Sequence, residues 1–134
     1  MAFELSKEGV RSDFINKIYE LSGECINACY HCGKCAAGCP SVNSMDLLPN
    51  QIIRAIQFGD IETLQTSNTP WVCASCYMCY VRCPRGIDLC RIMEAVRQMT
   101  LRENLDHLDI REYTDELANL PPIAVVSALR KLSS

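Results

Sequence analysis

The 134-residue sequence has no long hydrophobic run. Nothing in it approaches the roughly 20 apolar residues that a transmembrane helix needs, and the apolar stretch near the C-terminus, 121–126, is far too short. The first ten residues carry Glu4, Lys7 and Glu8 where a secretory signal would have an apolar core. We therefore expect a chain without a membrane span, located in the reducing cytoplasm.

Basic charge and recognisable catalytic motifs are also scarce. Lys and Arg number 13 against 16 Asp and Glu, which gives a formal net charge of −3. Binding of nucleic acid needs a basic face, so we exclude nucleic acid as a partner. There is no Gly-rich phosphate-binding loop, and a flavin or nicotinamide site within this chain is not expected. No Ser–His–Asp or paired-carboxylate arrangement stands out, and we assign no catalytic residue.

The alternation of apolar and polar residues that is typical of strands is missing, whereas helical spacing recurs. Four segments are expected to be helical: 13–21, 46–58, 87–101 and 123–132. We expect Asp46 to cap the second of these helices. Gly23 is expected to end the first helix in the left-handed conformation, and Gly59 to end the second. The sequence therefore predicts an all-α fold.

Cysteine, in contrast, is abundant. Ten cysteines are present, and eight of them fall into two runs that share the spacing C-x2-C-x2-C-x3-C-P. The first run is Cys29, Cys32, Cys35, Cys39 and Pro40, and the second is Cys73, Cys76, Cys79, Cys83 and Pro84. This spacing is typical of bacterial ferredoxins with two [4Fe–4S] clusters, in which the fourth cysteine of each run ligates the other cluster.

The spacing has a physical reason. Two-residue gaps let a tight turn direct three sulfurs at three corners of one cluster, and the proline after the fourth cysteine directs that sulfur elsewhere. One cluster is therefore expected to bind Cys29, Cys32, Cys35 and Cys83, and the other Cys73, Cys76, Cys79 and Cys39. A structural zinc site would need separated C-x2-C pairs, and a disulfide framework does not suit a reducing compartment.

Several residues near the runs leave alternatives open. Cys25 and Cys90 lie outside both runs, and we expect them to be small buried hydrophobic residues; an unusual ligand or a redox thiol is the alternative for Cys25. His31 is expected to be an exposed turn residue, with the alternative that it tunes a cluster. Three arginines are expected to flank the second cluster: Arg82, Arg85 and Arg91. They either form a solvated face, balance thiolate charge or dock an acidic partner.

The segment between the runs, 40–72, is long enough for a full helix, unlike the short connection in small ferredoxins. The expected architecture is therefore an α-helical ferredoxin-like dicluster domain with flanking helices. We place an N-terminal helix in 1–24, the two-cluster domain in 25–102 and a C-terminal extension that docks a partner in 103–134.

The chain resembles the C subunit of heterodisulfide reductase. The resemblance is strongest in CYHCGKCAAGCP, residues 29–40, and in WVCASCYMCYVRCPRG, residues 71–86. It extends over the intervening helix at 48–60 and over the tail from Leu120. All eight cysteines of the two runs match the family's ligand positions, whereas Cys25 and Cys90 have no place in that pattern.

The resemblance implies an electron-transfer component of an oxidoreductase complex that acts on disulfides. In this family, the C subunit receives electrons from a flavoprotein, the A subunit, and passes them to the B subunit, which reduces the disulfide. The alternatives are a free ferredoxin-like shuttle, an iron–sulfur component of a glycolate oxidase or fumarate reductase type of enzyme, and a non-redox protein that uses metal only to fold.

Overall fold

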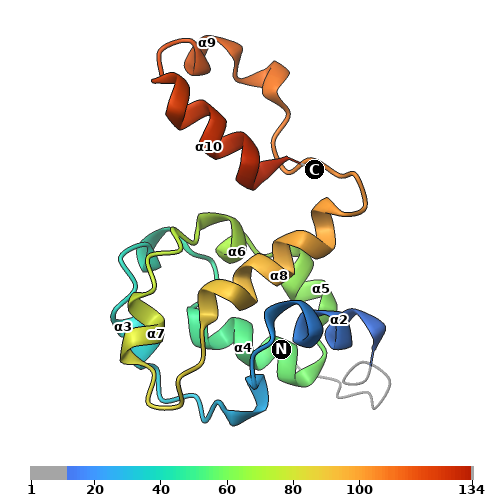
Figure 1. Ribbon diagram of the computed structural model, residues 1–134, viewed down its shortest axis with the longest axis vertical. Coiled ribbons are helices and arrows are strands. Elements are labelled where there is room, and N and C mark those ends of the chain that lie inside the picture. The colour runs from blue at the N-terminus through green and yellow to red at the C-terminus, as the bar shows by residue number, and fades with distance from the viewer. Residues whose placement is uncertain (1–11, 134) are drawn as a thin grey trace. The chain divides into compact units, whose positions relative to one another are not determined.

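The structure is a computed structural model that describes residues 12–133. Over this range the chain consists of helices and connecting loops without a strand (Figure 1), which confirms the predicted all-α fold. The chain divides into two compact units, 12–97 and 98–133 in the described range. Residues 1–11 of the predicted N-terminal segment lie outside the described residues. No helix within 12–133 has the length and apolar character that crossing a membrane requires.

The first unit contains most of the helices. Its elements are α2 (Asp13–Ser22), η1 (Ile26–Ala28), α3 (Lys34–Ala37), η2 (Val42–Ser44), α4 (Pro49–Phe58), α5 (Ile61–Thr66), α6 (Thr69–Val72), α7 (Met78–Arg82) and α8 (Leu89–Leu101), which continues into the second unit. The second unit adds η3 (Ile110–Glu112), α9 (Thr114–Leu117) and α10 (Pro122–Leu132). Loops account for much of the chain around the two cysteine runs.

Helix α2 begins and ends as its sequence predicts. The Ser12 hydroxyl oxygen accepts a hydrogen bond from the Ile15 amide (3.3 Å), so a side chain caps the start. Gly23 has φ +65° and donates its amide to the Tyr19 carbonyl. At the end of α4, Gly59 has φ +72°. A side chain at either glycine would be strained in this left-handed backbone, which explains both helix ends.

The start of α4 differs from the sequence prediction. Leu48, and not Asp46, is the N-cap residue, and Pro49 occupies the first helical position. The Gln51 side chain caps the helix instead, because its Oε1 accepts the Leu48 amide at 2.8 Å. Asp46 lies too far before the helix to cap it, and its carboxylate binds a different segment, described below.

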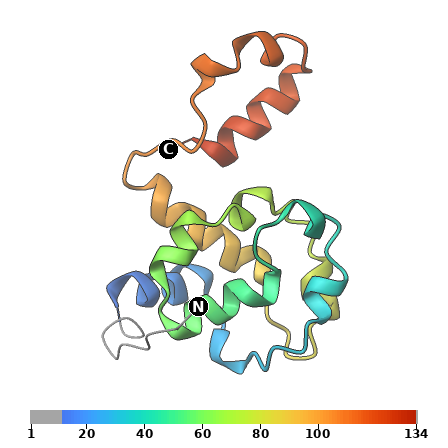
Figure 2. The ribbon, with the colours of Figure 1, turned by 180° about the vertical axis from the view of Figure 1, so that it is seen from behind.

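The core of the first unit is made mainly of isoleucine side chains from α2, α4 and α8. Ile18, Ile52, Ile56 and Ile92 have no exposed surface. Burial of each contributes about 1.5–3 kcal/mol. Helices α3 and α7 lie side by side at one side of this unit, and α2 and α5 lie at the opposite side (Figures 1 and 2). The helical core therefore supports two cysteine loops at its edge.

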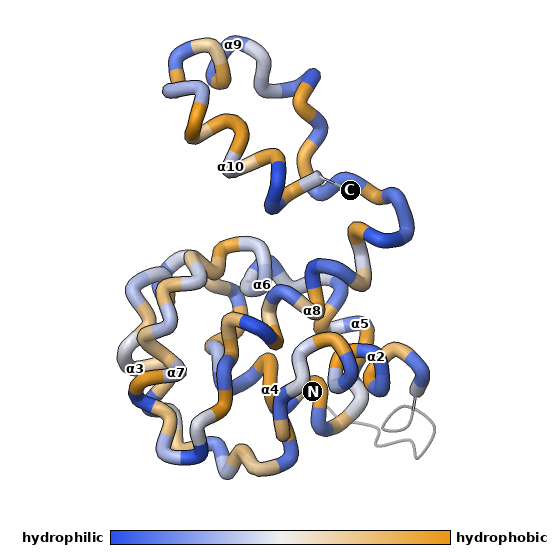
Figure 3. The backbone as a smooth tube through the Cα atoms, in the orientation of Figure 1, coloured by the Kyte–Doolittle hydropathy of each residue, from blue (hydrophilic) through white to orange (hydrophobic). Residues whose placement is uncertain are grey.

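Helix α10 carries apolar side chains that the second unit leaves exposed. Ile123 is 77% exposed and Val126 52% exposed, and apolar colour dominates α10 until Arg130 and Lys131 near its end (Figure 3). The two basic residues in the last turn suit the negative end of the helix dipole.

Candidate metal centre

The two cysteine runs adopt matching backbones, as their shared spacing suggests. Each has a left-handed residue directly before its first short helix: Gly33 (φ +78°) before α3 and Tyr77 (φ +61°) before α7. Two residues earlier, His31 (φ +60°) and Ser75 (φ +51°) share the same conformation. Only one of these four residues is glycine, and a left-handed backbone costs other residues about 1–2 kcal/mol. The rest of the site must therefore hold these turns in place.

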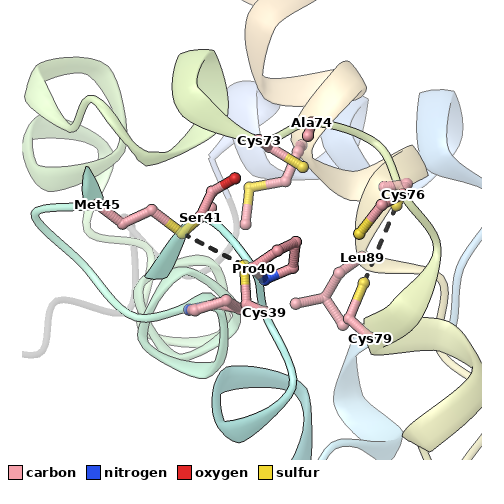
Figure 4. A pocket seen from close by; sticks show the side chains of 12 residues that line it. Cys39, Pro40, Ser41, Met45, Cys73, Ala74, Cys76, Cys79 and Leu89 are labelled. Carbon is pink, nitrogen blue, oxygen red and sulfur yellow. Dashed lines mark hydrogen bonds between the residues drawn. The ribbon is translucent and has the colours of Figure 1, made fainter. Parts of the chain in front are cut away.

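One pocket brings cysteines of both runs together. Its lining includes Cys39 from the first run with Cys73, Cys76 and Cys79 from the second (Figure 4). The remaining walls are largely apolar and include Pro49, Leu89 and Met93. A set of soft thiol donors in an apolar shell is the chemistry that an iron–sulfur cluster needs.

The other four cysteines of the runs are also near one another. Burial, and after it the neighbouring thiols of Cys29 and Cys32, raise the pKa of Cys35. Desolvation, and after it the neighbouring thiols of Cys32 and Cys83, raise the pKa of Tyr30. Helix α3, which carries Cys35, contacts helix α7, which carries Cys79. The two cysteine runs therefore adjoin each other.

Backbone amides point at cysteine sulfurs in both runs. The His31 amide donates to Cys29 Sγ at 3.5 Å, and the Ile87 amide donates to Cys83 Sγ at 3.4 Å. Burial raises the pKa of the Cys35 and Cys79 thiols, so metal binding at these positions must displace protons. Within 12–133, no three or more Cys, His, Asp or Glu side chains converge on the position of a single metal ion.

The two cysteines outside the runs have different environments. Cys90 is buried, as predicted, and its Sγ lies 3.9 Å from Cys79 Sγ; burial raises its pKa to about 12. Cys25 is exposed, which corrects the prediction that it is buried. It directly precedes η1 in the connection that leaves α2, and this connection runs along the surface.

His31 is exposed, as predicted, but it is not isolated. Its Nε2 lies 2.7 Å from Gln57 Oε1 on α4. The Gln57 amide in turn donates to the carbonyl of Ile26 at 2.9 Å and to that of Cys29 at 3.4 Å. The sequence does not single out Gln57, because an amide on the polar side of a helix looks like any solvated residue. It attaches α4 to the first cysteine loop.

Asp46 connects the end of the first loop to the start of the second. Its carboxylate accepts hydrogen bonds from the Ser67 hydroxyl (2.7 Å), the Asn68 amide (2.9 Å) and the Thr69 hydroxyl (2.8 Å). Burial alone would raise the pKa of Asp46, but the hydrogen bonds outweigh it and lower this pKa to about 2. We call Asp46 with residues 67–69 the Asp46 staple.

The three flanking arginines have separate contacts. Arg91 is 3.7 Å from the Glu24 carboxylate and 3.6 Å from that of Asp88. The Arg85 guanidinium lies 5.5 Å from the centre of the Tyr30 ring. Arg82 packs on Gly38, where an added Cβ would lie 2.5 Å from Arg82 Cδ. Positions 38 and 82 are equivalent in the two runs, so the first run has a glycine where the second run's arginine needs space.

Comparisons with known proteins agree with this site. A sequence profile of the 4Fe-4S dicluster domain matches residues 28–88. The chain is 30% identical over 107 residues to the iron-sulfur C subunit of the CoB–CoM heterodisulfide reductase of Methanopyrus kandleri, covering 74% of this chain and 56% of that protein. It is also 30% identical over 107 residues to the C2 subunit of the H2/formate:CoB-CoM heterodisulfide,ferredoxin reductase of Methanococcus maripaludis, covering 74% and 58%.

The match to a third relative covers a larger share of that relative's length than the first two matches do. It is the C subunit of the ferredoxin/F420H2-dependent CoB-CoM heterodisulfide reductase of Methanosarcina acetivorans, 30% identical over 115 residues, which are 84% of this chain and 71% of that protein. The chain spans little more than half the length of the first two relatives. Its dicluster domain implies two [4Fe–4S] clusters and a role as an iron–sulfur electron-transfer subunit. The chain belongs to the family of heterodisulfide reductase C subunits.

Proposed function

We propose that this chain relays electrons through two [4Fe–4S] clusters in a heterodisulfide reductase-type complex in the cytoplasm, between the flavoprotein A subunit and the disulfide-reducing B subunit. Another chain contacts the disulfide, and this one contributes no catalytic residue. The observation that supports the proposal most is the pocket in which Cys39 joins Cys73, Cys76 and Cys79. Donors from both runs in one pocket suit two clusters held close together.

The ligand sets follow the crossed pattern. We assign Cys29, Cys32, Cys35 and Cys83 to the first cluster, and Cys73, Cys76, Cys79 and Cys39 to the second. When bound, the clusters supply one-electron redox chemistry. The chain's own residues hold the thiols in place, direct the His31 and Ile87 amides at ligand sulfurs and keep water from part of the site with apolar walls. These features set the redox potential in iron–sulfur proteins.

The crossed pattern is tested by comparing single alanine variants in pairs. Anaerobically prepared protein should hold about eight irons per chain, and Cys39→Ala and Cys83→Ala should each hold markedly fewer. The electron paramagnetic resonance spectrum of reduced Cys39→Ala should match that of Cys76→Ala, and the spectrum of Cys83→Ala should match that of Cys32→Ala. Cys25→Ala is the control and should keep all its iron. The opposite pairing of spectra would refute the crossed assignment.

The role within a complex is tested separately from the ligands. A member of a stable complex elutes from anaerobic gel filtration of native extract at high mass, and mass spectrometry should identify a flavoprotein and a second iron–sulfur protein beside it. Elution as a monomer would favour the free shuttle, and co-elution with a glycolate oxidase or fumarate reductase type of chain would favour that alternative. Visible absorbance that fails to bleach with dithionite would indicate a metal with no redox role.

The C-terminal extension is proposed to dock another chain of the complex. The exposed Ile123 and Val126 side chains on α10 support this, because exposed apolar side chains on one helix are typical of a surface that a partner covers. Deletion of 120–134 should weaken co-purification with the other subunits while the visible absorbance stays unchanged. Unchanged assembly after the deletion would contradict the docking role.

A further inference from the structure

The Cys90 thiol is not needed by either ligand set, yet it contacts one of the ligands. Its Sγ lies 3.9 Å from Cys79 Sγ, within the range of a hydrogen bond that involves sulfur. Both side chains line the pocket that also contains Cys39, Cys73 and Cys76, and the dashed line that reaches the Cys79 sulfur in Figure 4 marks the contact. Cys90 therefore lies beside the second cluster's ligands without being counted among them.

The position of Cys90 is fixed by the start of α8. Its amide donates to Asp88 Oδ1 at 2.9 Å, which caps the first turn of this helix. The residue is only 4% exposed, and its neighbours Leu89 and Met93 are buried as well. The thiol therefore has almost no access to solvent. The Tyr77 backbone amide is a donor to its sulfur, and the Cys79 sulfur is the acceptor within reach of its own proton.

The direction of this hydrogen bond follows from the chemistry of ligation. A cysteine bound to iron is a thiolate and only accepts hydrogen bonds, so the proton must come from Cys90. Met45 shows the contrast: its sulfur lies 4.0 Å from Cys39 Sγ, but a thioether has no proton to donate. Of these two sulfur neighbours, only Cys90 remains a donor once the ligands are deprotonated.

We propose that the Cys90 thiol donates a hydrogen bond to the Cys79 ligand and thereby raises the reduction potential of the second [4Fe–4S] cluster. The reason is electrostatic: reduction adds negative charge that spreads onto the ligand sulfurs, and a donor at one sulfur favours the more negative state. The inference rests on the proposed assignment of Cys79 to the second cluster. It makes the two clusters inequivalent, although their ligand spacings are the same.

The test is a redox titration of the holoprotein and four variants, with the iron content of Cys79→Ala measured beside them. Cys90→Ala removes the donor and should lower the ratio of reduced to oxidised second cluster at a fixed potential about threefold, a shift of about 28 mV at 59 mV per tenfold change for one electron. Cys90→Ser keeps a donor and should restore part of the shift. Met45→Leu keeps the shape of the pocket without a hydrogen-bond change, and Cys25→Ser changes the other extra cysteine; both should titrate like the unaltered protein.

The outcomes separate this inference from the proposed function. Iron content near eight per chain with a shift in only one of the two one-electron steps supports the donor role. An unchanged potential in Cys90→Ala overturns it, and so does an equal shift in Met45→Leu. If Cys90→Ala loses the second cluster while Cys79→Ala keeps it, Cys90 is itself the ligand and the inference is wrong. Absence of both clusters from the unaltered protein would instead refute the proposed function.

Discussion

Replacement of Asp46 by asparagine should loosen the connection between the two cysteine loops. Oδ1 of Asp46 accepts from the Ser67 and Thr69 hydroxyls, and Oδ2 accepts from the Asn68 amide. Asparagine keeps one acceptor oxygen but places an NH2 group against the Asn68 amide, so that two donors face each other. The segment that follows the first run then loses a contact with the segment that leads into the second.

The size of the effect follows from the pKa of Asp46. The difference between the ordinary pKa of 3.8 and about 2 corresponds to about 2.4 kcal/mol, at about 1.36 kcal/mol per pKa unit. Because Asp46 is exposed, solvent screening reduces this to about 1–2 kcal/mol. An effect of this size changes a local opening equilibrium about 5–30-fold.

The assay follows the loss of visible absorbance under anaerobic conditions with an excess of iron chelator. Release of iron requires the loops to open, so Asp46→Asn should bleach about 5–30 times faster than the unaltered protein at neutral pH. Glu103→Gln removes another exposed carboxylate, outside the Asp46 staple, and should bleach at the unaltered rate.

The pH dependence provides a second check. The folded pKa of Asp46 is lowered, so its stabilisation is fully present above pH 3.8 and is lost only as the pH falls toward 2. The ratio of the bleaching rates of Asp46→Asn and the unaltered protein should therefore be constant between about pH 6 and 9. Equal rates at neutral pH, or a ratio that changes strongly across this range, would refute the role assigned to the staple.

Three further substitutions have defined outcomes. Gly38→Ala places a Cβ 2.5 Å from Arg82 Cδ and should lower the free energy of unfolding in a denaturant titration by about 1 kcal/mol. Adding Arg82→Ala to this variant should recover the loss, whereas additive effects of the two substitutions would contradict the contact. Arg97 Nη1 donates to the Pro70 carbonyl at 2.7 Å, and Arg97→Leu leaves this carbonyl without its buried donor. The substitution should lower the free energy of unfolding in a denaturant titration by about 1–3 kcal/mol, and Arg97→Lys should lower it less. Gln57→Leu removes both hydrogen bonds that the Gln57 amide donates to the first loop. It should speed iron loss from the first cluster more than from the second, which electron paramagnetic resonance can follow.

The sequence was sufficient where a feature depends on residues close together in the chain. The cysteine spacing predicts two sites with matched turns, because two-residue gaps restrict where three sulfurs can point. The ends of α2 and α4 at Gly23 and Gly59 were also predictable, since a left-handed residue after a helix favours glycine irrespective of the rest of the fold. The left-handed backbones of His31, Ser75 and Tyr77 were not predicted, because a positive φ is uncommon in any residue other than glycine.

Only the tertiary structure decided the contacts between distant segments. Asp46 precedes a helix and looks like its cap, yet it binds residues 21–23 positions further along the chain. Cys90 has an unremarkable place in an apolar helix, yet it contacts a thiol 11 positions earlier. A polar side chain takes the partners that packing brings within hydrogen-bond distance, and local spacing does not determine that packing. The sequence thus determined which residues suit iron, and the fold determined which side chains surround them.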